Sequence, residues 1–157
     1  MTVRIQTGPF DAQAEADALR EGDLEVGAVV TFVGTVRDVN DGDSVATLEL
    51  EHYPGMTEKA IAAIVDEART RWALADTLVI HRYGPLRPGE AIMMVATAAR
   101  HRKAAFEAAE YLMDYLKSRA PFWKKEERAG DADWVEARQS DDAAAARWSG
   151  RKPEAAE

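Results

Sequence analysis

An uncharged run of eleven residues, from Val26 to Val36, is the feature that most constrains how this chain can fold. Its residues are β-branched or apolar on both faces, a pattern typical of a strand that is buried on two sides. We therefore predict a central strand here that ends at Arg37. The run is too short to cross a bilayer as a helix, which needs about 20 apolar residues.

Strand and helix patterns alternate along the rest of the chain. Strands are predicted over 3–7, 46–53, 77–83, 91–98 and 133–138, and helices over 11–19, 57–72, 103–117 and 141–148. Asp41-Gly42 is a hairpin turn signal, so strand 46–53 is expected to pair with the strand before it. Antiparallel hairpins interleaved with helices predict an α+β fold, with a mostly antiparallel sheet and about three helices packed on it.

The helix boundaries can be placed from individual residues. Asp11 is expected to cap the first helix and Thr57 the second. The third helix is expected to bury an apolar face that contains Phe106 and Met113, and to end soon after Lys117, because Pro121 cannot continue it.

The length of 157 residues suits one domain, which we place at 1–148, with a flexible tail at 149–157. The chain has no cysteine, which excludes disulfides, thiolate zinc sites and a cysteine nucleophile. His52, His81 and His101 show no short metal-ligand spacing. Neither a metal nor a bound cofactor is therefore expected.

The overall charge limits the kinds of partner. The chain carries 20 basic and 28 acidic side chains, a net charge of -8, which argues against binding long nucleic acid. The N-terminal residues lack the apolar block of a signal peptide, and no run is long enough to span a membrane. We expect a soluble, cytoplasmic protein.

The segment from Lys117 to Arg128 runs against this acidic background, with five cations and two carboxylates in twelve positions. Such a cluster indicates an anionic ligand. The break at Pro121 would let the chain fold back and direct both Lys117 and Lys124 toward one site. In the alternative interpretation, Lys117 and Arg119 only complement the helix dipole, at about 0.3–1 kcal/mol.

Two further places could hold an anion. Arg37 follows the predicted buried strand and could offer its planar guanidinium at the edge of a cleft, or it could be a surface arginine. The run from Arg100 to Lys103 opens a helix, where cations oppose the dipole. Together with helix N–H groups it could form a phosphate site, or it could be a solvated basic turn.

Several of these runs together resemble the large, catalytic subunit of molybdopterin synthase. The runs that carry the resemblance are Phe32-Val33-Gly34-Thr35-Val36-Arg37, Leu50-Glu51-His52-Tyr53-Pro54-Gly55-Met56-Thr57, His101-Arg102, Lys117-Ser118-Arg119-Ala120-Pro121-Phe122-Trp123-Lys124 and Trp134-Val135-Glu136-Ala137-Arg138. The resemblance extends from about Gly27 to Trp148. Lys103 departs from it, because relatives are expected to have a small residue there.

The resemblance implies an α/β hammerhead-type fold and a sulfurtransferase. The family's enzyme converts cyclic pyranopterin monophosphate to molybdopterin by adding two sulfurs as a dithiolene. The sulfur arrives as a thiocarboxylate on the C-terminal Gly-Gly of a small, ubiquitin-like partner subunit. Large subunits in this family form a homodimer, with one small subunit at each end, which gives a heterotetramer.

The resemblance also implies roles for individual residues. The family's catalytic lysines fall on Lys117 and Lys124. Its substrate-contacting positions fall on Thr35, Val36, Arg37, His101, Arg102, Lys125 and Glu126. Arg37, His101 and Arg102 would hold the cyclic phosphate. Lys117 would be the essential group, acting either in proton transfer or as a nucleophile toward the partner's acyl group.

A second function of a different class stays open at this point. The same basic residues could serve a non-catalytic adaptor that only holds an anion or a protein tail. An adaptor should lose affinity gradually as each cation is removed, whereas an enzyme should lose turnover sharply at Lys117.

Overall fold

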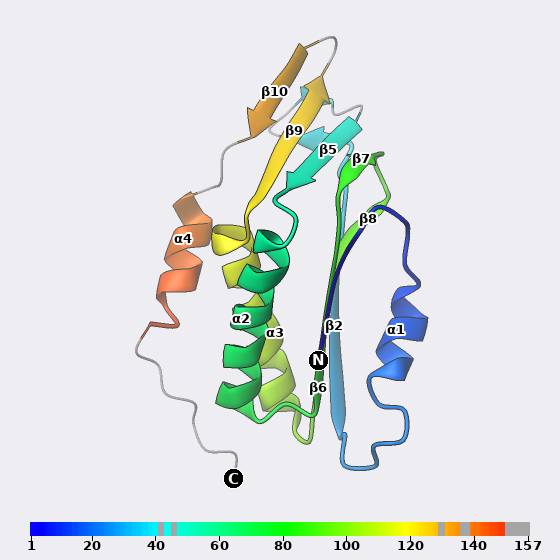
Figure 1. Cartoon of the computed structure of the whole chain (residues 1–157), viewed down its shortest axis with the longest axis vertical. Helices are drawn as coiled ribbons and strands as arrows, with labels where there is room; N and C mark the ends of the chain where they lie inside the picture. The colour runs from blue at the N-terminus through cyan, green and yellow to red at the C-terminus, as the bar shows by residue number, and fades with distance from the viewer. Residues whose placement is uncertain (41–42, 45–46, 129–130, 136–138, 150–157) are drawn as a thin grey trace.

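The apolar strand patterns produce a four-stranded sheet that forms the body of the molecule (Figure 1). Its strands, in spatial order, are β1 (Thr2–Gln6), β6 (Asp76–Arg82), β8 (Ala91–Ala99) and β2 (Ala28–Thr35). β1 lies parallel to β6, and the other two pairs are antiparallel. The chain is described here from a computed structural model.

A second four-stranded sheet lies at one end of the first (Figure 1). It consists, in order, of β10 (Asp131–Val135), β9 (Phe122–Arg128), β5 (Thr47–His52) and β7 (Gly84–Leu86), all antiparallel. A short hairpin of β3 (Val39–Asn40) and β4 (Asp43–Ser44) is separate from both sheets. The predicted α+β class, with a mostly antiparallel sheet, is confirmed.

The structure describes residues 1–40, 43–44, 47–128, 131–135 and 139–149. Only the backbone is described for residues 39–40, 43–44, 123, 125–128, 131–135 and 139–141. The predicted turn at Asp41-Gly42 and nearly all of the predicted tail therefore lie outside the described residues.

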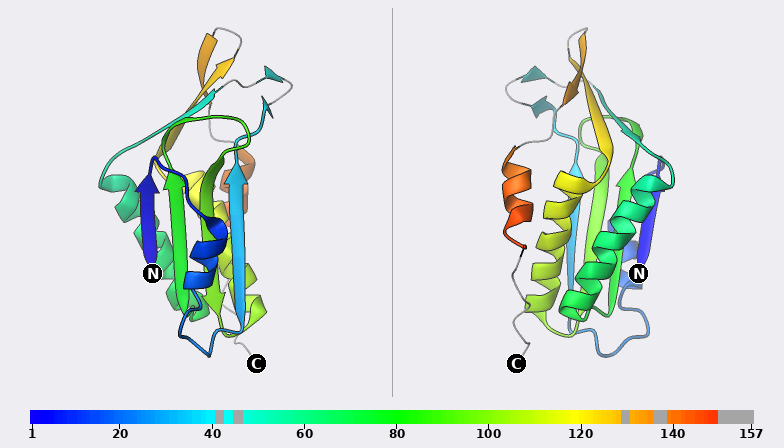
Figure 2. Two further views of the ribbon diagram at one scale, coloured as in Figure 1. Left: turned by 90° about the vertical axis from the view of Figure 1, so that its right-hand side faces the viewer. Right: turned by 60° about the vertical axis from the view of Figure 1, so that its left-hand side comes forward.

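Helices cover both faces of the first sheet (Figure 2). α1 (Ala12–Ala18) lies on one face, and α2 (Met56–Trp72) and α3 (Arg102–Arg119) lie on the other. α4 (Gln139–Ala146) packs against α3. Asp11 caps α1 as predicted, because its carboxylate accepts from the backbone N–H groups of Gln13 and Ala14 at 3.0 and 3.1 Å.

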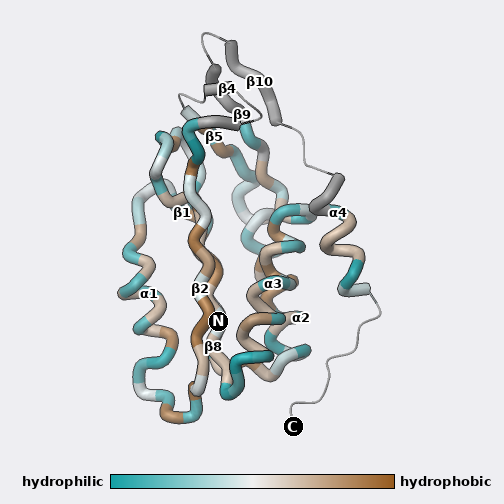
Figure 3. The backbone as a smooth tube through the Cα atoms, turned by 180° about the vertical axis from the view of Figure 1, so that it is seen from behind, coloured by the Kyte–Doolittle hydropathy of each residue, from teal (hydrophilic) through white to brown (hydrophobic). Residues whose placement is uncertain are grey.

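Apolar side chains of the first sheet form two cores, one on each face. Figure 3 shows that β2 and β8 are largely hydrophobic. The larger core joins α2 and α3 to the sheet through fully buried residues such as Ile61, Val95 and Leu112. The buried hydroxyl of Thr97 also donates to the Ala105 carbonyl at 2.8 Å, which fixes β8 to α3. A third core, described below, joins the two sheets.

The predicted position of β2 was wrong, because β2 is an edge strand of the sheet rather than a central one. Phe32 and Val33 remain 40% and 38% exposed. The predicted pairing of 46–53 with this strand was also wrong, since β5 pairs with β7 and β9. The chain leaves the first sheet after Thr35, forms the β3–β4 hairpin and enters the second sheet, so one side of β2 carries no described strand.

Two details of the predicted helices also differ. Gly55, not Thr57, occupies the cap position of α2, and the Thr57 hydroxyl accepts from the Tyr53 N–H at 3.1 Å. Phe106 is 63% exposed, because the buried face of α3 is rotated away from it. That face consists of Ala105, Ala108, Ala109, Tyr111, Leu112, Tyr115 and Leu116.

The close approach of Gly27 to Arg100 yields a testable prediction. A Cβ at Gly27 would lie 2.3 Å from the Arg100 carbonyl oxygen, and backbone cannot move aside as a flexible side chain can. Gly27→Ala is expected to lower the free energy of unfolding by about 1–3 kcal/mol in urea denaturation. Gly8→Ala is the control, because nothing lies within 4 Å of its added Cβ. Equal stability of both variants would contradict the described packing.

Candidate active site

The end of α3 is built to reverse the chain. Helix α3 ends at Arg119, and Ala120 adopts an extended conformation with φ -71° and ψ 128°. The Phe122 N–H then donates to the Ala120 carbonyl at 2.8 Å, closing a three-residue turn centred on Pro121. The ring of proline fixes a φ that suits this turn. The helix therefore stops before Pro121, as the sequence predicted, and the chain passes directly into β9, a strand that was not predicted.

This reversal places Lys117 and Lys124 at the same end of the molecule. Lys117 lies in the last turn of α3, and Lys124 is the third residue of β9. Both side chains are exposed. Arg119 turns instead onto the ring of Tyr115, 4.5 Å from its centroid.

The end of β2 reaches the same region through the third core. Val36 is buried with Leu48, Leu50 and Leu86, which belong to the second sheet. Leu50 lies directly opposite Lys124 in the β5–β9 pairing. Residues opposite each other in an antiparallel pair share a face of the sheet. The Val36 end of β2 and Lys124 therefore border the same core.

Local backbone contacts fix the position of Arg37 at this end. The Val36 N–H donates to the Glu90 carbonyl at 2.9 Å, and the Gly89 N–H donates to the Val36 carbonyl at 2.8 Å. The pairing with β8 shifts between Gly34 and Thr35, a bulge of the kind that redirects side chains near functional sites. The structure thus places Thr35, Val36, Arg37, Lys117 and Lys124 at the same end of the molecule.

His101 and Arg102 lie at the opposite end of the chain fold. They stand at the start of α3, and Lys117 is fifteen residues further along that helix. At 1.5 Å per residue, this separates them by roughly 22 Å. The end of β2 is also far from His101 and Arg102. Ala28, at the start of β2, pairs with Ala99, just before His101 in the chain, whereas Thr35, at the end of β2, pairs with Ala91 at the other end of β8. One copy of the chain therefore does not bring His101 and Arg102 to Arg37 and the lysines.

The remaining predicted contacts can be placed only by their backbone. Lys125 pairs with Glu49 and Trp134, and Glu126 pairs with Leu48 and Asp133. Both lie in β9 beyond Lys124, in the middle of the second sheet.

An imidazole cluster that the sequence did not single out lies beside Lys124. His81 stacks on Phe122 with ring centroids 3.8 Å apart and 18° between planes, and His52 lies 4.5 Å from the ring of Tyr83. Burial and, to a smaller extent, the charge of Lys124 lower the pKa of His81 from its usual 6.5 to about 4, although a hydrogen bond to the Arg82 carbonyl opposes this change. His81 is therefore neutral at pH 7.

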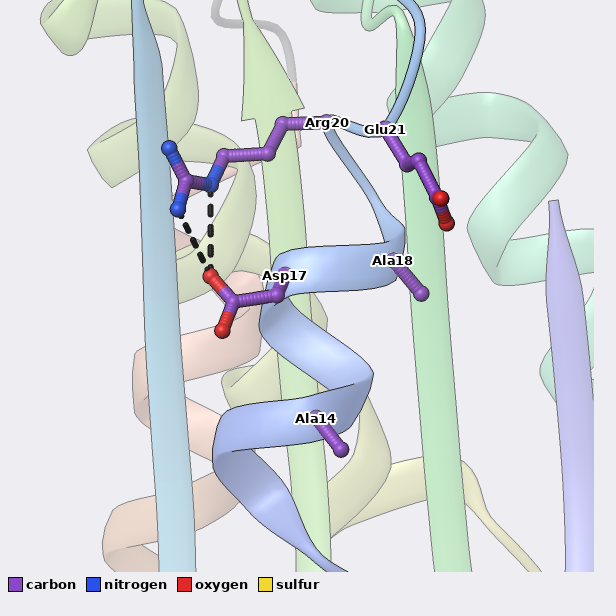
Figure 4. A pocket seen from close by; sticks show the side chains of 5 residues that line it. All are labelled: Ala14, Asp17, Ala18, Arg20 and Glu21. Atoms are coloured by element: carbon purple, nitrogen blue, oxygen red, sulfur yellow. Dashed lines mark hydrogen bonds and ion pairs between the residues drawn. The ribbon is translucent and has the colours of Figure 1, made fainter.

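A shallow hollow on α1 does not fit the predicted chemistry (Figure 4). It is lined by Ala14, Asp17, Ala18, Arg20 and Glu21. Its cation, Arg20, donates to the Asp17 carboxylate at 2.7 Å and is already paired. The hollow also belongs to α1, which covers the face of the sheet opposite α3.

The described residues offer neither a metal site nor a membrane-spanning helix. Across these residues, no group of three or more His, Asp or Glu side chains could hold a metal ion. In the same part of the chain, no helix combines the length and apolar character that crossing a bilayer requires.

Solved structures of known proteins share this fold. A structure of molybdopterin cofactor biosynthesis protein E from Burkholderia multivorans is 54% identical, with a TM-score of 0.80, and the match covers 94% of this chain and 96% of that one. A structure of molybdopterin synthase from Staphylococcus aureus is 33% identical, with a TM-score of 0.78, and covers 85% of this chain and 96% of that one. The fold is thus that of the molybdopterin synthase structures.

Sequence comparisons define the family. A family model described as MoaE protein matches residues 5–119. The molybdopterin synthase catalytic subunit of Cereibacter sphaeroides is 61% identical over 148 residues, covering 94% of this chain and 100% of the relative. The chain therefore belongs to the MoaE protein family.

The buried His81 generates a prediction about stability and pH. Its folded pKa of about 4 lies below the usual 6.5, so the unfolded chain binds more protons between these values. The free energy of unfolding should therefore fall as the pH drops from about 6.5 to about 4, and His81 should account for roughly 3 kcal/mol of that fall. Urea denaturation of the wild type and of His81→Gln across this range measures the contribution.

The matched control is His101→Gln, which removes an exposed imidazole. Wild type and the control should show the same dependence on pH, and His81→Gln a shallower one. A His81→Gln variant with the wild-type dependence would contradict a neutral, buried His81.

Proposed function

We propose that this chain is the catalytic subunit of a molybdopterin synthase that adds two sulfurs to cyclic pyranopterin monophosphate. The 61% identity to a catalytic subunit over almost the whole chain carries this proposal. The clustering of Arg37, Lys117 and Lys124 at one end supports it, because the substrate is an anion and the reaction builds further negative charge.

The sulfur donor would be the C-terminal thiocarboxylate of a small partner subunit ending in Gly-Gly. A flexible tail of two glycines can reach side chains that lie at the junction of two sheets. Each transfer breaks the carbon–sulfur bond of the tail, and water returns the acyl carbon to a carboxylate. This route agrees with a chain that contains no cysteine of its own.

Within this reaction, the residues of this chain have distinct tasks. Lys117 would move a proton or briefly accept the acyl group, and Lys124 would steady the anion or the carboxyl end of the tail. Thr35, Val36 and Arg37 would position the pterin phosphate at the end of β2. Positive charge held in place before the reaction stabilises negative charge as it forms. Lys125 and Glu126, further along β9, would contact the substrate as well.

His101 and Arg102 would enter the site from a second copy of the chain. Within one copy they lie roughly 22 Å from Lys117. A homodimer, such as the family resemblance implies, can remove this separation, because a two-fold axis brings opposite ends of two copies together. The uncharged strand β2, with Phe32 and Val33 exposed, offers a surface for such contact. A small subunit at each end would complete a heterotetramer that works in the cytoplasm.

The adaptor alternative is not favoured. Relatives at about 60% identity carry the name of the catalytic subunit, and the two lysines that the chemistry needs lie at one end of the structure.

Removing Lys117 should separate an enzyme from an adaptor. Lys117→Ala is expected to lower product formation by at least about a hundredfold while the partner subunit still binds, because the missing group acts in the chemical step. Formation of the dithiolene pterin from a thiocarboxylated partner and the cyclic pterin phosphate measures turnover, and calorimetry measures binding. Lys59→Ala, exposed on α2, is the control that should keep the wild-type rate. A Lys117→Ala variant with the wild-type rate would refute the assigned role.

A mixture of two inactive variants should reveal the shared site. If a second copy supplies Arg102, then Lys117→Ala and Arg102→Ala dimers are both impaired, yet a mixed dimer keeps one intact site. Random mixing should therefore restore about a quarter of the wild-type activity. Co-refolding of the two variants, followed by the same assay, makes the measurement. Activity no higher than the mean of the separate variants would show that Arg102 is not shared.

A further inference from the structure

We propose that His81 is a positioning residue for Lys124, because its ring packs against Phe122 and so fixes the start of β9. This inference rests on the proposed function for its activity test, but its structural test is independent of that function. The sequence analysis considered His81 only as a metal ligand, and the proposed mechanism assigns it no task.

The burial and contacts of His81 show a side chain with one fixed orientation. Only 7% of the residue is exposed. Its Nδ1 lies 2.9 Å from the Arg82 carbonyl oxygen. A carbonyl oxygen can only accept, so Nδ1 must carry the hydrogen. The neutral ring is therefore held in one tautomer, with its plane set by β6.

Phe122 transmits this orientation to β9. Its ring stacks on His81 at a centroid distance of 3.8 Å, and its backbone pairs with His52 of β5. Alternate residues of a strand point to the same face. Phe122 and Lys124 therefore share one face of β9, and the position of Phe122 sets the position of Lys124.

The turn before Phe122 makes hydrogen bonds that are mostly local or long. Phe122 follows Pro121 directly, and its N–H bonds within the turn, to the Ala120 carbonyl. The Pro121 carbonyl accepts a bond from the Thr57 hydroxyl only at 3.4 Å, which is long for such a contact. Ala120 and Phe122 also pack against the larger core, and the stack on His81 is the ring contact that joins the start of β9 directly to β6.

The neutrality of His81 also suits this place. The charge of Lys124 reaches the imidazole and disfavours its protonation, as does His52. By reciprocity, a positively charged residue at position 81 would repel the ammonium group of Lys124. An uncharged ring supports the strand without weakening the positive charge that the proposed reaction uses.

Two substitutions at position 81 distinguish the effect of the flat aromatic ring from that of the imidazole hydrogen bond. His81→Leu removes the flat surface on which Phe122 stacks, whereas His81→Phe keeps an aromatic ring and loses only the bond to Arg82. We expect kcat to fall at least about tenfold in His81→Leu, with KM for the partner changed less than about threefold, since small misplacements of a reacting group lower turnover strongly. His81→Phe should keep kcat within about threefold of the wild type.

Ile80→Val is the matched control for a loss of packing. Ile80 is the neighbouring buried residue of β6, but it belongs to the core on the α1 side of the sheet and is remote from Phe122. Ile80→Val should leave kcat unchanged. Thermal unfolding of each variant confirms that it is folded at the assay temperature.

A measurement on Lys124 itself completes the test without the enzyme assay. The NMR signal of the Lys124 side chain, assigned by its absence in Lys124→Arg, should shift in His81→Leu and stay in place in Ile80→Val. A folded His81→Leu variant with unchanged kcat and an unchanged Lys124 signal would overturn the proposal. If even the wild type makes no product, the proposed function fails, and the NMR signal alone decides the role of His81.

Discussion

The reversal of the chain at Pro121 is the constraint on which the rest of the site depends. The turn ends α3 after Arg119 and starts β9 three residues later. Without it, a continued helix would carry Lys124 about 10 Å beyond Lys117 and leave β5 paired with β7 alone. Because the turn exists, two lysines seven positions apart lie at one end of the fold, beside the end of β2.

The second sheet holds the end of β2 close to the start of β9. It buries Leu48, Leu50 and Leu86 against Val36, so the end of β2 and the start of β9 are held over one core. The cations around this core lie in a chain of net charge -8. A local positive potential in an acidic protein favours a small anionic ligand over long nucleic acid. The neutral imidazole of His81, close to Lys124, leaves that potential intact.

Much of this arrangement could be predicted from the sequence. The helix stop at Pro121, the cap at Asp11 and the alternation of Leu48 and Leu50 are local signals, and the structure confirms them. The edge position of β2 could not be predicted, because an apolar strand has the same residue pattern whether a neighbouring strand or another surface covers its edge. The roughly 22 Å between Arg102 and Lys117 follows from the predicted helix itself. The sequence did not show which end of that helix lies near the end of β2, since this depends on the directions of β2 and α3. His81 was missed because stacking on Phe122 leaves no trace in residue spacing.

The most direct test of this account asks which lysine the partner's tail reaches. A zero-length carbodiimide reagent can join the C-terminal carboxylate of the small subunit to a lysine amine that lies against it, and mass spectrometry of the digested complex identifies that lysine. We predict an amide bond between the terminal glycine and Lys117 or Lys124. A complex that forms but joins the tail only to Lys59, on the exposed side of α2, would contradict the site described here.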